Sequence, residues 1–167
     1  MRVKSASRLA GLGAGALSAL VCLGAYATNQ PDSCSSALGR ATVAEGKELA
    51  GELEVLSWNI QKASQQGWAE DLTDFGEGID LAFIQEAAVE AEIPRFLPSG
   101  LYSNFAEGYA TASRATGVMT LSAGSPSVHC QLTHREPWLG TPKATSITEF
   151  PLEGRDDRLL AINLHAI

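Results

Sequence analysis

Short apolar runs separated by turn-forming residues recur along the chain from residue 53 onward. The runs LEVLSWNI (53–60) and DLAFIQEA (80–87) are typical of strands in a buried sheet. Between them, GWAEDLTDFGEGI (67–79) places its large apolar side chains at helical spacing. This segment predicts an amphipathic helix that ends at Gly76 or Gly78.

The later part of the sequence is richer in β-forming residues. A short helix is expected at about 89–96, because Pro98 and Gly100 would end it. Further strands are predicted at 117–122, 128–132, 144–151 and 158–164. Early helices followed by hairpin-like strands indicate a mixed α/β sheet rather than a regular doubly wound fold.

The N-terminus has the layout of an export signal. The first eight residues carry three basic side chains and no acidic one, and 9–27 has no charge. We interpret 1–27 as a signal peptide cleaved after Ala27, with an uncleaved membrane anchor at 9–27 as the alternative. The polar segment 28–51 is expected to be a linker, and 52–167 to be one domain. The protein is therefore expected to be exported to the periplasm or the extracellular medium.

Charge and cysteine content further restrict the class of protein to which the chain can belong. Removal of the leader changes the formal net charge from −7 to −10, because nine basic and nineteen acidic residues remain. No basic stripe of the kind that binds polyanions is visible, although an acidic enzyme can still bind phosphates through a cation. Cys34 and Cys130 remain in the mature chain, either as a disulfide in an oxidising compartment or as two unpaired thiols.

Polar residues follow three of the predicted apolar strands. Asn59 follows the first strand, Gln85 and Glu86 follow the second, and Asn163 and His165 interrupt the last. If these strands are neighbours, the polar groups converge at one edge of a sheet. A carboxylate with amide oxygens suits a hard cation such as Mg²⁺, and an imidazole beside it can move a proton or hold a phosphoryl oxygen.

Each of these residues also has a purely structural interpretation. Glu86 can satisfy backbone N–H groups at a helix N-terminus, and Asn59 can be a turn residue. Asn163 can be a polar residue at a strand edge, and His165 a hydrogen-bonded core imidazole. For any one of them taken alone, the structural interpretation is the better one.

Taken together, the segments resemble the endonuclease/exonuclease/phosphatase family, which includes DNase I, exonuclease III, neutral sphingomyelinases and inositol polyphosphate 5-phosphatases. LSWNIQK resembles the family's first strand and DLAFIQEA its second motif. TGVMTLSAGSPSVHCQLTHREPWL resembles the central hairpin, and TPKATSITEFPL with LLAINLHAI resembles the strand pair that follows. GVMTLS and REP are particularly close to a bacterial subgroup, the YafD-like proteins.

The resemblance implies a DNase I-like α/β sandwich, a mixed and largely antiparallel sheet with flanking helices, of which 52–167 is the N-terminal half. It also implies a Mg²⁺ (or Mn²⁺) cofactor. Glu86 would be the metal ligand, and Asn59 a catalytic neighbour of both metal and phosphate. His165 would be the catalytic histidine that contacts the phosphate.

Two family segments do not occur in this sequence. These are the GDFN-type segment, which positions the nucleophile and the phosphate, and the SDH-type segment, whose histidine is the general base. His129 and His134 match neither role. The chain is therefore expected to be truncated, and inactive and poorly soluble by itself.

The function expected of the parent protein is hydrolysis of a phosphoester by in-line attack of water. The substrate would be a nucleic acid, a phospholipid or a small phosphate ester. One alternative is a non-catalytic exported binding module. Another is a sphingomyelinase-like lipid phosphodiesterase, for which an exposed aromatic loop around Tyr102, Phe105 and Tyr109 would be the distinguishing feature.

Overall fold

The structure is a computed structural model that describes residues 34, 37–40, 46–137 and 140–165. The expected signal peptide, 1–27, lies outside the described residues. Within the described ranges, no helix has the length and apolar character needed to cross a membrane.

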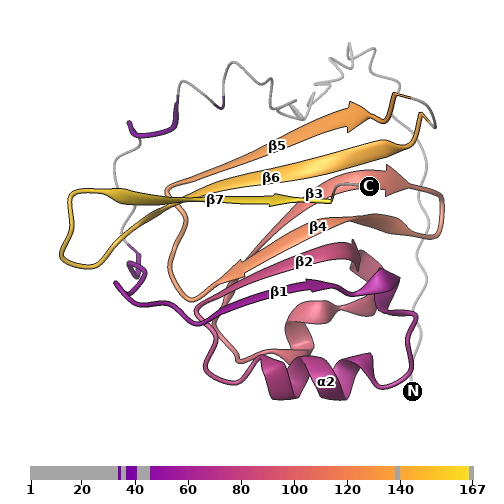
Figure 1. Ribbon diagram of the computed structural model, residues 1–167, viewed down its shortest axis with the longest axis horizontal. Coiled ribbons are helices and arrows are strands. Elements are labelled where there is room, and N and C mark those ends of the chain that lie inside the picture. The colour runs from indigo at the N-terminus through magenta and orange to yellow at the C-terminus, as the bar shows by residue number, and fades with distance from the viewer. Residues whose placement is uncertain (1–33, 35–36, 41–45, 138–139, 166–167) are drawn as a thin grey trace, which may run out of the picture.

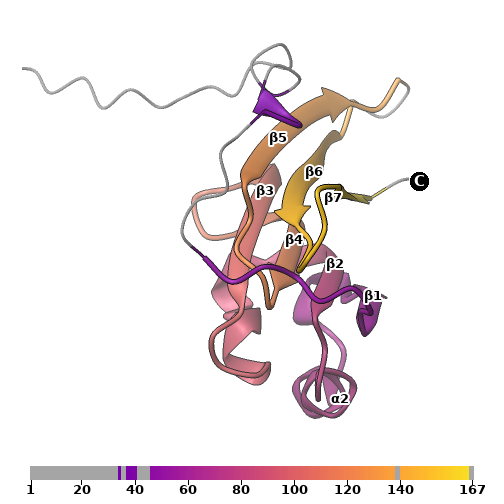
Figure 2. The ribbon, with the colours of Figure 1, turned by 90° about the vertical axis from the view of Figure 1, so that its left-hand side faces the viewer.

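Two β-sheets face each other in the molecule (Figures 1 and 2). The first sheet has four strands in the order β1-β2-β4-β3, and the second has three in the order β5-β6-β7. β1 runs parallel to β2, and the other neighbouring strands are antiparallel. The strands are β1 Val55–Asn59, β2 Leu81–Ala88, β3 Tyr102–Ala110, β4 Ala115–Ser122, β5 Val128–Arg135, β6 Pro142–Pro151 and β7 Arg158–Leu164.

Side chains of β2 alternate between two apolar layers, as the period of a strand requires. Ala82 and Ile84 pack in the cluster that includes Leu72 of helix α2 (Trp68–Phe75), on the outer face of the first sheet. Leu81 packs with Phe150 of β6 between the two sheets. Burial on both faces explains why this strand reads as a nearly continuous apolar run.

Helix α2 connects β1 to β2 and confirms the predicted amphipathic helix. It ends at Phe75, and the Gly76 N–H donates to the carbonyl of Leu72. A Cβ at Gly76 would lie 2.2 Å from Cδ2 of Leu97 and 2.7 Å from the Leu72 oxygen. Only glycine therefore allows the helix to end this close to its neighbours.

The helix expected at 89–96 is replaced by two 3₁₀ turns, η2 (Val89–Ala91) and η3 (Ile93–Phe96). They are separated by Glu92, whose φ of +49° is left-handed. Pro94 explains the break, because it has no N–H to donate within a continuous α-helix, whereas it is tolerated in the first turn of η3.

The four later strands lie where they are expected, but the prediction of an exposed aromatic loop is wrong. Tyr102, Phe105 and Tyr109 belong to β3, which pairs with β4 along its length. β3 is an edge strand with many polar side chains, so its sequence lacks a clear apolar run. A bulge between Glu107 and Tyr109 also interrupts its alternation. Pairing with β4 supplies the strand structure that local sequence does not.

β7 is the edge strand of the second sheet, and its side chains alternate strictly. Ala161 and Asn163 are buried against the first sheet, whereas Leu160, Ile162 and Leu164 are about half exposed. This outward apolar row, here called the β7 outer row, lies along a strand whose second edge is unpaired within the described residues.

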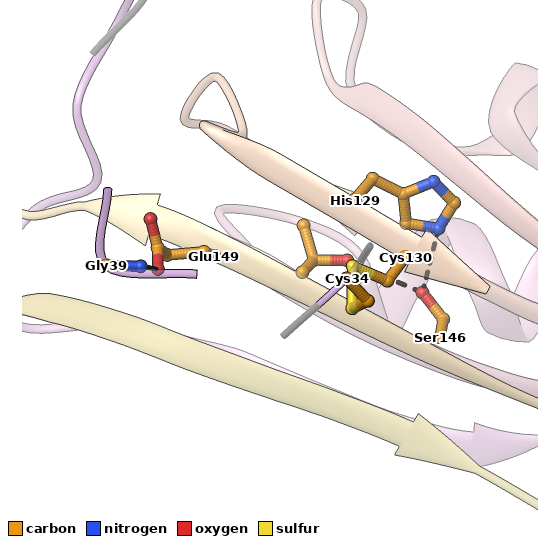
Figure 3. Close-up of a disulfide and its surroundings, with 7 residues drawn as sticks. Cys34, Gly39, His129, Cys130, Ser146 and Glu149 are labelled. Carbon is orange, nitrogen blue, oxygen red and sulfur yellow. Dashed lines mark hydrogen bonds between the residues drawn. A yellow bond between two sulfur atoms is a disulfide. The ribbon is translucent and has the colours of Figure 1, made fainter. Parts of the chain in front are cut away.

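The N-terminal residues that the structure describes are joined to the second sheet (Figure 3). Cys34 forms a disulfide with Cys130 of β5, and the Gly39 N–H donates to Glu149 of β6. Leu49 is buried and packs on Phe150. The disulfide interpretation of the two cysteines is therefore confirmed, and a disulfide is typical of oxidising compartments.

Candidate functional site

The parallel pairing of β1 and β2 brings Asn59 next to Glu86. Asn59 lies opposite Gln85, so polar side chains of both strands lie at the same edge of the sheet. The Asn59 amide donates from Nδ2 to Oε1 of Glu86 across 3.2 Å. Its Oδ1 accepts the backbone N–H of Gln61 at 3.0 Å. These two bonds fix which way the amide faces.

A β-bulge sets the direction of the Glu86 side chain. The pairing of β2 with β4 shifts register between Ile84 and Ala87, and Glu86 within this bulge has a φ of +50°. A left-handed non-glycine residue costs about 1–3 kcal/mol and is found where the surrounding structure enforces it. Bulges of this kind re-aim a side chain out of the ladder, and here the carboxylate turns toward Asn59.

A second strained segment places Lys62 on the same carboxylate. Gln61, Lys62 and Ala63 have φ values of +50°, +60° and +56°, an uncommon run for residues other than glycine. The turn carries Nζ of Lys62 to 3.1 Å from Oε2 of Glu86. Lys62 is about half exposed, so it is the more solvent-accessible partner of this pair.

His165 follows β7 and completes the cluster from the second sheet. Its Nε2 lies 3.4 Å from Oε1 of Glu86 and 3.5 Å from Nδ2 of Asn59. Its Nδ1 lies 3.2 Å from Nζ of Lys143, which is also 3.1 Å from Oε1 of Glu136. The three residues predicted as site residues, Asn59, Glu86 and His165, therefore lie together.

Gln85 and Asn163 also lie close to one another but do not join this cluster. The Gln85 amide donates to Oδ1 of Asn163 at 2.9 Å, and Asn163 donates to the carbonyl of Met119 at 3.0 Å. Asn163 is 1% exposed, so it is buried between the sheets. These two amides join the sheets rather than face a ligand.

Glu86 and His165 of this cluster line a cavity of about 320 Å³. Lys62, Glu86, Lys143 and His165 supply its charged and titratable groups. The rest of the lining comes from β3, β4 and the start of β6, and it includes Gly108, Gly117, Tyr109, Val118, Pro142 and Ala144. A Cβ at Gly117 would lie 2.0 Å from the Ala106 carbonyl oxygen, so this part of the wall is backbone.

Sequence reasoning missed three members of this network, Lys62, Lys143 and Glu136. Lys62 stands three residues after Asn59 in a stretch already singled out, but nothing local indicates that its turn is left-handed. Glu136 and Lys143 are joined across the β5–β6 connection, and Glu136 is 6% exposed. A buried charged pair of this kind is visible only once the hairpin is formed.

The Glu86 carboxyl is held in its ionised form. Burial alone raises the pKa of Glu86, but the hydrogen bonds from Asn59 and Lys62 and the positive charges of Lys62 and of protonated His165 outweigh it. The net result is a pKa below the ordinary value of 4.5. The site therefore presents a negatively charged carboxylate at neutral pH.

Among the residues that the structure describes, no group of three or more His, Cys, Asp and Glu side chains has the arrangement of a metal site. Mg²⁺, however, usually keeps several waters and is held by one or two carboxylates together with phosphate oxygens. Glu86 fits that pattern as a single carboxylate ligand. The Asn59 oxygen is already bonded to Gln61, so Asn59 fits as the residue that orients the carboxylate.

Comparison with known proteins identifies relatives in sequence. No model of a protein family matches the chain. A UPF0294 protein of Vibrio vulnificus (strain YJ016) is 33% identical over 140 residues, which cover 83% of this chain and 48% of the relative. A UPF0294 protein of Klebsiella pneumoniae (strain 342) is 36% identical over 118 residues, which cover 70% and 44%. The chain thus spans about half the length of the curated relatives it matches.

A solved structure has a fold similar to that of this chain. An endonuclease/exonuclease/phosphatase family protein from Leptotrichia buccalis C-1013-b superimposes with a TM-score of 0.54 at 10% sequence identity, covering 70% of this chain and 55% of that chain. At this identity the likeness concerns the fold alone. It confirms the expected α/β class, and the chain therefore has a DNase I-like α/β fold and sequence similarity to UPF0294 proteins.

Proposed function

We propose that this chain carries the metal- and phosphate-binding part of an exported, Mg²⁺-dependent phosphoester hydrolase. The observation that carries the proposal is the meeting of Asn59, Glu86 and His165, which come from β1, β2 and the end of β7. Their contacts join positions up to 106 residues apart. Two polar side chains and a histidine converging at a sheet edge beside a cavity favour a ligand site over three separate structural roles.

Each residue has a defined task in the proposed site. Glu86 would hold the hydrated cation, either Mg²⁺ or Mn²⁺, in competition with Lys62, which now pairs with Oε2. The bound cation would neutralise charge that develops on the phosphoryl oxygens. Asn59 orients the Glu86 carboxylate, and His165 faces the phosphoryl group from the opposite sheet.

The cavity supports a phosphoester with a compact organic group as substrate. Lys62, Lys143 and His165 line it together with the apolar and aromatic side chains of Val118 and Tyr109. A nucleic acid, a phospholipid and a small phosphate ester all carry such a group next to the phosphate. The lipid alternative is weakened, because the expected aromatic loop is the paired strand β3.

A second candidate function is a non-catalytic binding module. The observation that favours it is the ion pair between Lys62 and Glu86, because an ammonium group occupies the place where a cation would sit. In this alternative the site binds an anionic ligand through Lys62, Lys143 and His165 without a metal.

The test measures binding of Mn²⁺, a paramagnetic substitute for Mg²⁺, and hydrolysis of bis(p-nitrophenyl) phosphate by the same chain. Glu86→Gln keeps the shape of the side chain but loses the charge that attracts the cation. We expect this variant to lose Mn²⁺ binding and any Mn²⁺-dependent turnover. Glu77→Gln, an exposed carboxylate outside the cavity, is the matched control and should bind like the parent chain.

Two results would count against the hydrolase. Equal Mn²⁺ binding by the Glu86 and Glu77 variants would remove Glu86 from the metal site. Binding of inorganic phosphate that needs no divalent cation and survives Glu86→Gln would favour the binding module instead.

A further inference from the structure

The ring of His165 lies between groups that differ in what they can donate and accept. Lys143 approaches Nδ1 at 3.2 Å. At the other nitrogen, Nε2, Oε1 of Glu86 lies 3.4 Å away and Nδ2 of Asn59 lies 3.5 Å away. A neutral imidazole carries one N–H, so these neighbours determine which nitrogen has it.

The group at Nδ1 can only donate. A lysine ammonium has three N–H donors and no acceptor, and Lys143 also pairs with Glu136 at 3.1 Å. The side chain of Lys143 is 16% exposed and that of Glu136 is 6% exposed, so water competes little for this pair. Nδ1 of His165 must therefore accept, which leaves it without a proton.

The neighbours of Nε2 complete the assignment. The Asn59 amide is fixed by the Gln61 N–H at its oxygen, so it presents N–H to this side of the cluster. The Glu86 carboxylate is thus the acceptor that an Nε2–H can reach. The Nε2–H then faces Oε1 of Glu86 at 3.4 Å, and the Asn59 amide donates to the same oxygen at 3.2 Å.

We propose that Lys143, held by Glu136, is a positioning residue that fixes His165 as the neutral tautomer with its proton on Nε2. A consequence, which rests on the proposed function, concerns the role of the ring. His165 presents an N–H donor on the side of Glu86, so it donates to a phosphoryl oxygen and is not the base that takes a proton from water there. The tautomer itself requires neither metal nor turnover.

The test is ¹⁵N NMR of the histidine side chains in the chain at about pH 8, above the ordinary pKa of histidine. The chain has three histidines, and His165→Gln identifies the signal of interest. We expect a single tautomer protonated at Nε2, with Nδ1 shifted by its bond from Lys143. A ring protonated at Nδ1, or a rapidly exchanging mixture of tautomers, would overturn the proposal.

Variants separate the role of Lys143 from that of Glu136. Glu136→Gln keeps the donor at Nδ1 and should leave the tautomer unchanged. The double variant Glu136→Gln/Lys143→Glu puts an acceptor at Nδ1, so the proton should move to that nitrogen. An unchanged Nε2–H tautomer in the folded double variant would show that Lys143 does not set it.

Lys143→Met and Lys143→Arg give a second measurement that does not depend on the charge swap. A methionine side chain cannot donate, so in Lys143→Met the Nδ1 signal should move to the position of an unbonded ring nitrogen. The guanidinium of Lys143→Arg can donate, so that variant should restore the signal. The same Nδ1 shift in the parent chain and in Lys143→Met would contradict the hydrogen bond. Absence of Mn²⁺ binding in a chain that gives the expected spectra would count against the proposed function and leave the tautomer assignment standing.

Discussion

Gln85 and Asn163 join the two sheets through a hydrogen bond of 2.9 Å between side chains that are 78 positions apart. Asn163 extends the connection by donating to the Met119 carbonyl at 3.0 Å and toward the hydroxyl of Thr120 at 3.4 Å. Buried polar groups are costly unless they are paired, so this bridge specifies how β7 lies on the first sheet.

The first prediction concerns that bridge. Asn163→Ala removes the donor to the Met119 carbonyl and leaves the Gln85 amide only the Phe83 carbonyl at 3.3 Å, and each buried unsatisfied group costs about 1–3 kcal/mol. We expect the free energy of unfolding in urea to fall by at least that amount. Gln131→Ala, which removes a hydrogen bond to the Glu107 carbonyl in an exposed setting, should cost less. Equal losses for the two variants would contradict a special role for the bridge.

The second prediction is a pH dependence of stability that depends on Glu149. Burial raises the pKa of Glu149, but the Gly39 N–H, the Ser127 hydroxyl and the Arg158 guanidinium outweigh it and lower the pKa below 4.5. A lowered pKa in the folded state contributes stability that is fully present above the ordinary value of 4.5 and is lost as the pH falls through the folded value.

Glu149→Gln tests this dependence. We expect the variant to be less stable than the parent chain at neutral pH and to show a shallower loss of stability below pH 4.5, measured by urea unfolding across pH. Glu153→Gln, on an exposed carboxylate, should follow the parent curve. If the Glu149 variant lost stability below pH 4.5 as steeply as the parent chain, Glu149 would be excluded as the cause of the pH dependence.

The third prediction concerns competition between Lys62 and a cation for Glu86. Half-exposed ion pairs are worth about 0.2–1 kcal/mol, so Lys62→Met should tighten Mn²⁺ binding by roughly 1.5- to 5-fold. Isothermal titration with Mn²⁺ measures the change. Lys47→Met, on an exposed lysine that does not line the cavity, is the control. Weaker binding by the Lys62 variant would mean that the lysine assists the cation rather than replaces it.

The fourth prediction concerns the β7 outer row. An edge strand with exposed apolar side chains favours association between chains, and a lysine on such an edge opposes it. Ile162 is 52% exposed, so Ile162→Lys should raise the soluble concentration and reduce oligomers in light scattering without loss of stability. Ala161→Lys changes the neighbouring, buried position and should unfold the chain instead. No change in association for Ile162→Lys would show that the chains do not associate through this edge.

The fifth prediction concerns export. The uncharged run 9–27 after a basic start predicts cleavage after Ala27, and the Cys34–Cys130 disulfide agrees with an oxidising compartment. N-terminal sequencing of protein from the periplasm or the medium should begin at Thr28. Material that begins at Met1 and sediments with membranes would favour the anchor.

Much of the fold is contained in local sequence patterns. The apolar runs of β1, β2 and β4 to β7 and the helical spacing of α2 are properties of neighbouring residues, so they predict these elements directly. β3 and the 3₁₀ turns around Glu92 were not predicted. β3 depends on pairing with β4, and the turns depend on how Pro94 interrupts the backbone bonds.

The sequence by itself also singled out Asn59, Glu86 and His165, although Glu86 lies within β2 rather than after it. Only the tertiary structure decided that they meet, because the contact between Asn59 and His165 depends on sheet packing over 106 positions. It likewise decided the direction of the Asn59 amide and the placement of Lys62 and Lys143. These features follow from left-handed turns, a bulge and a buried ion pair, and such features arise from long-range contacts that no local pattern encodes.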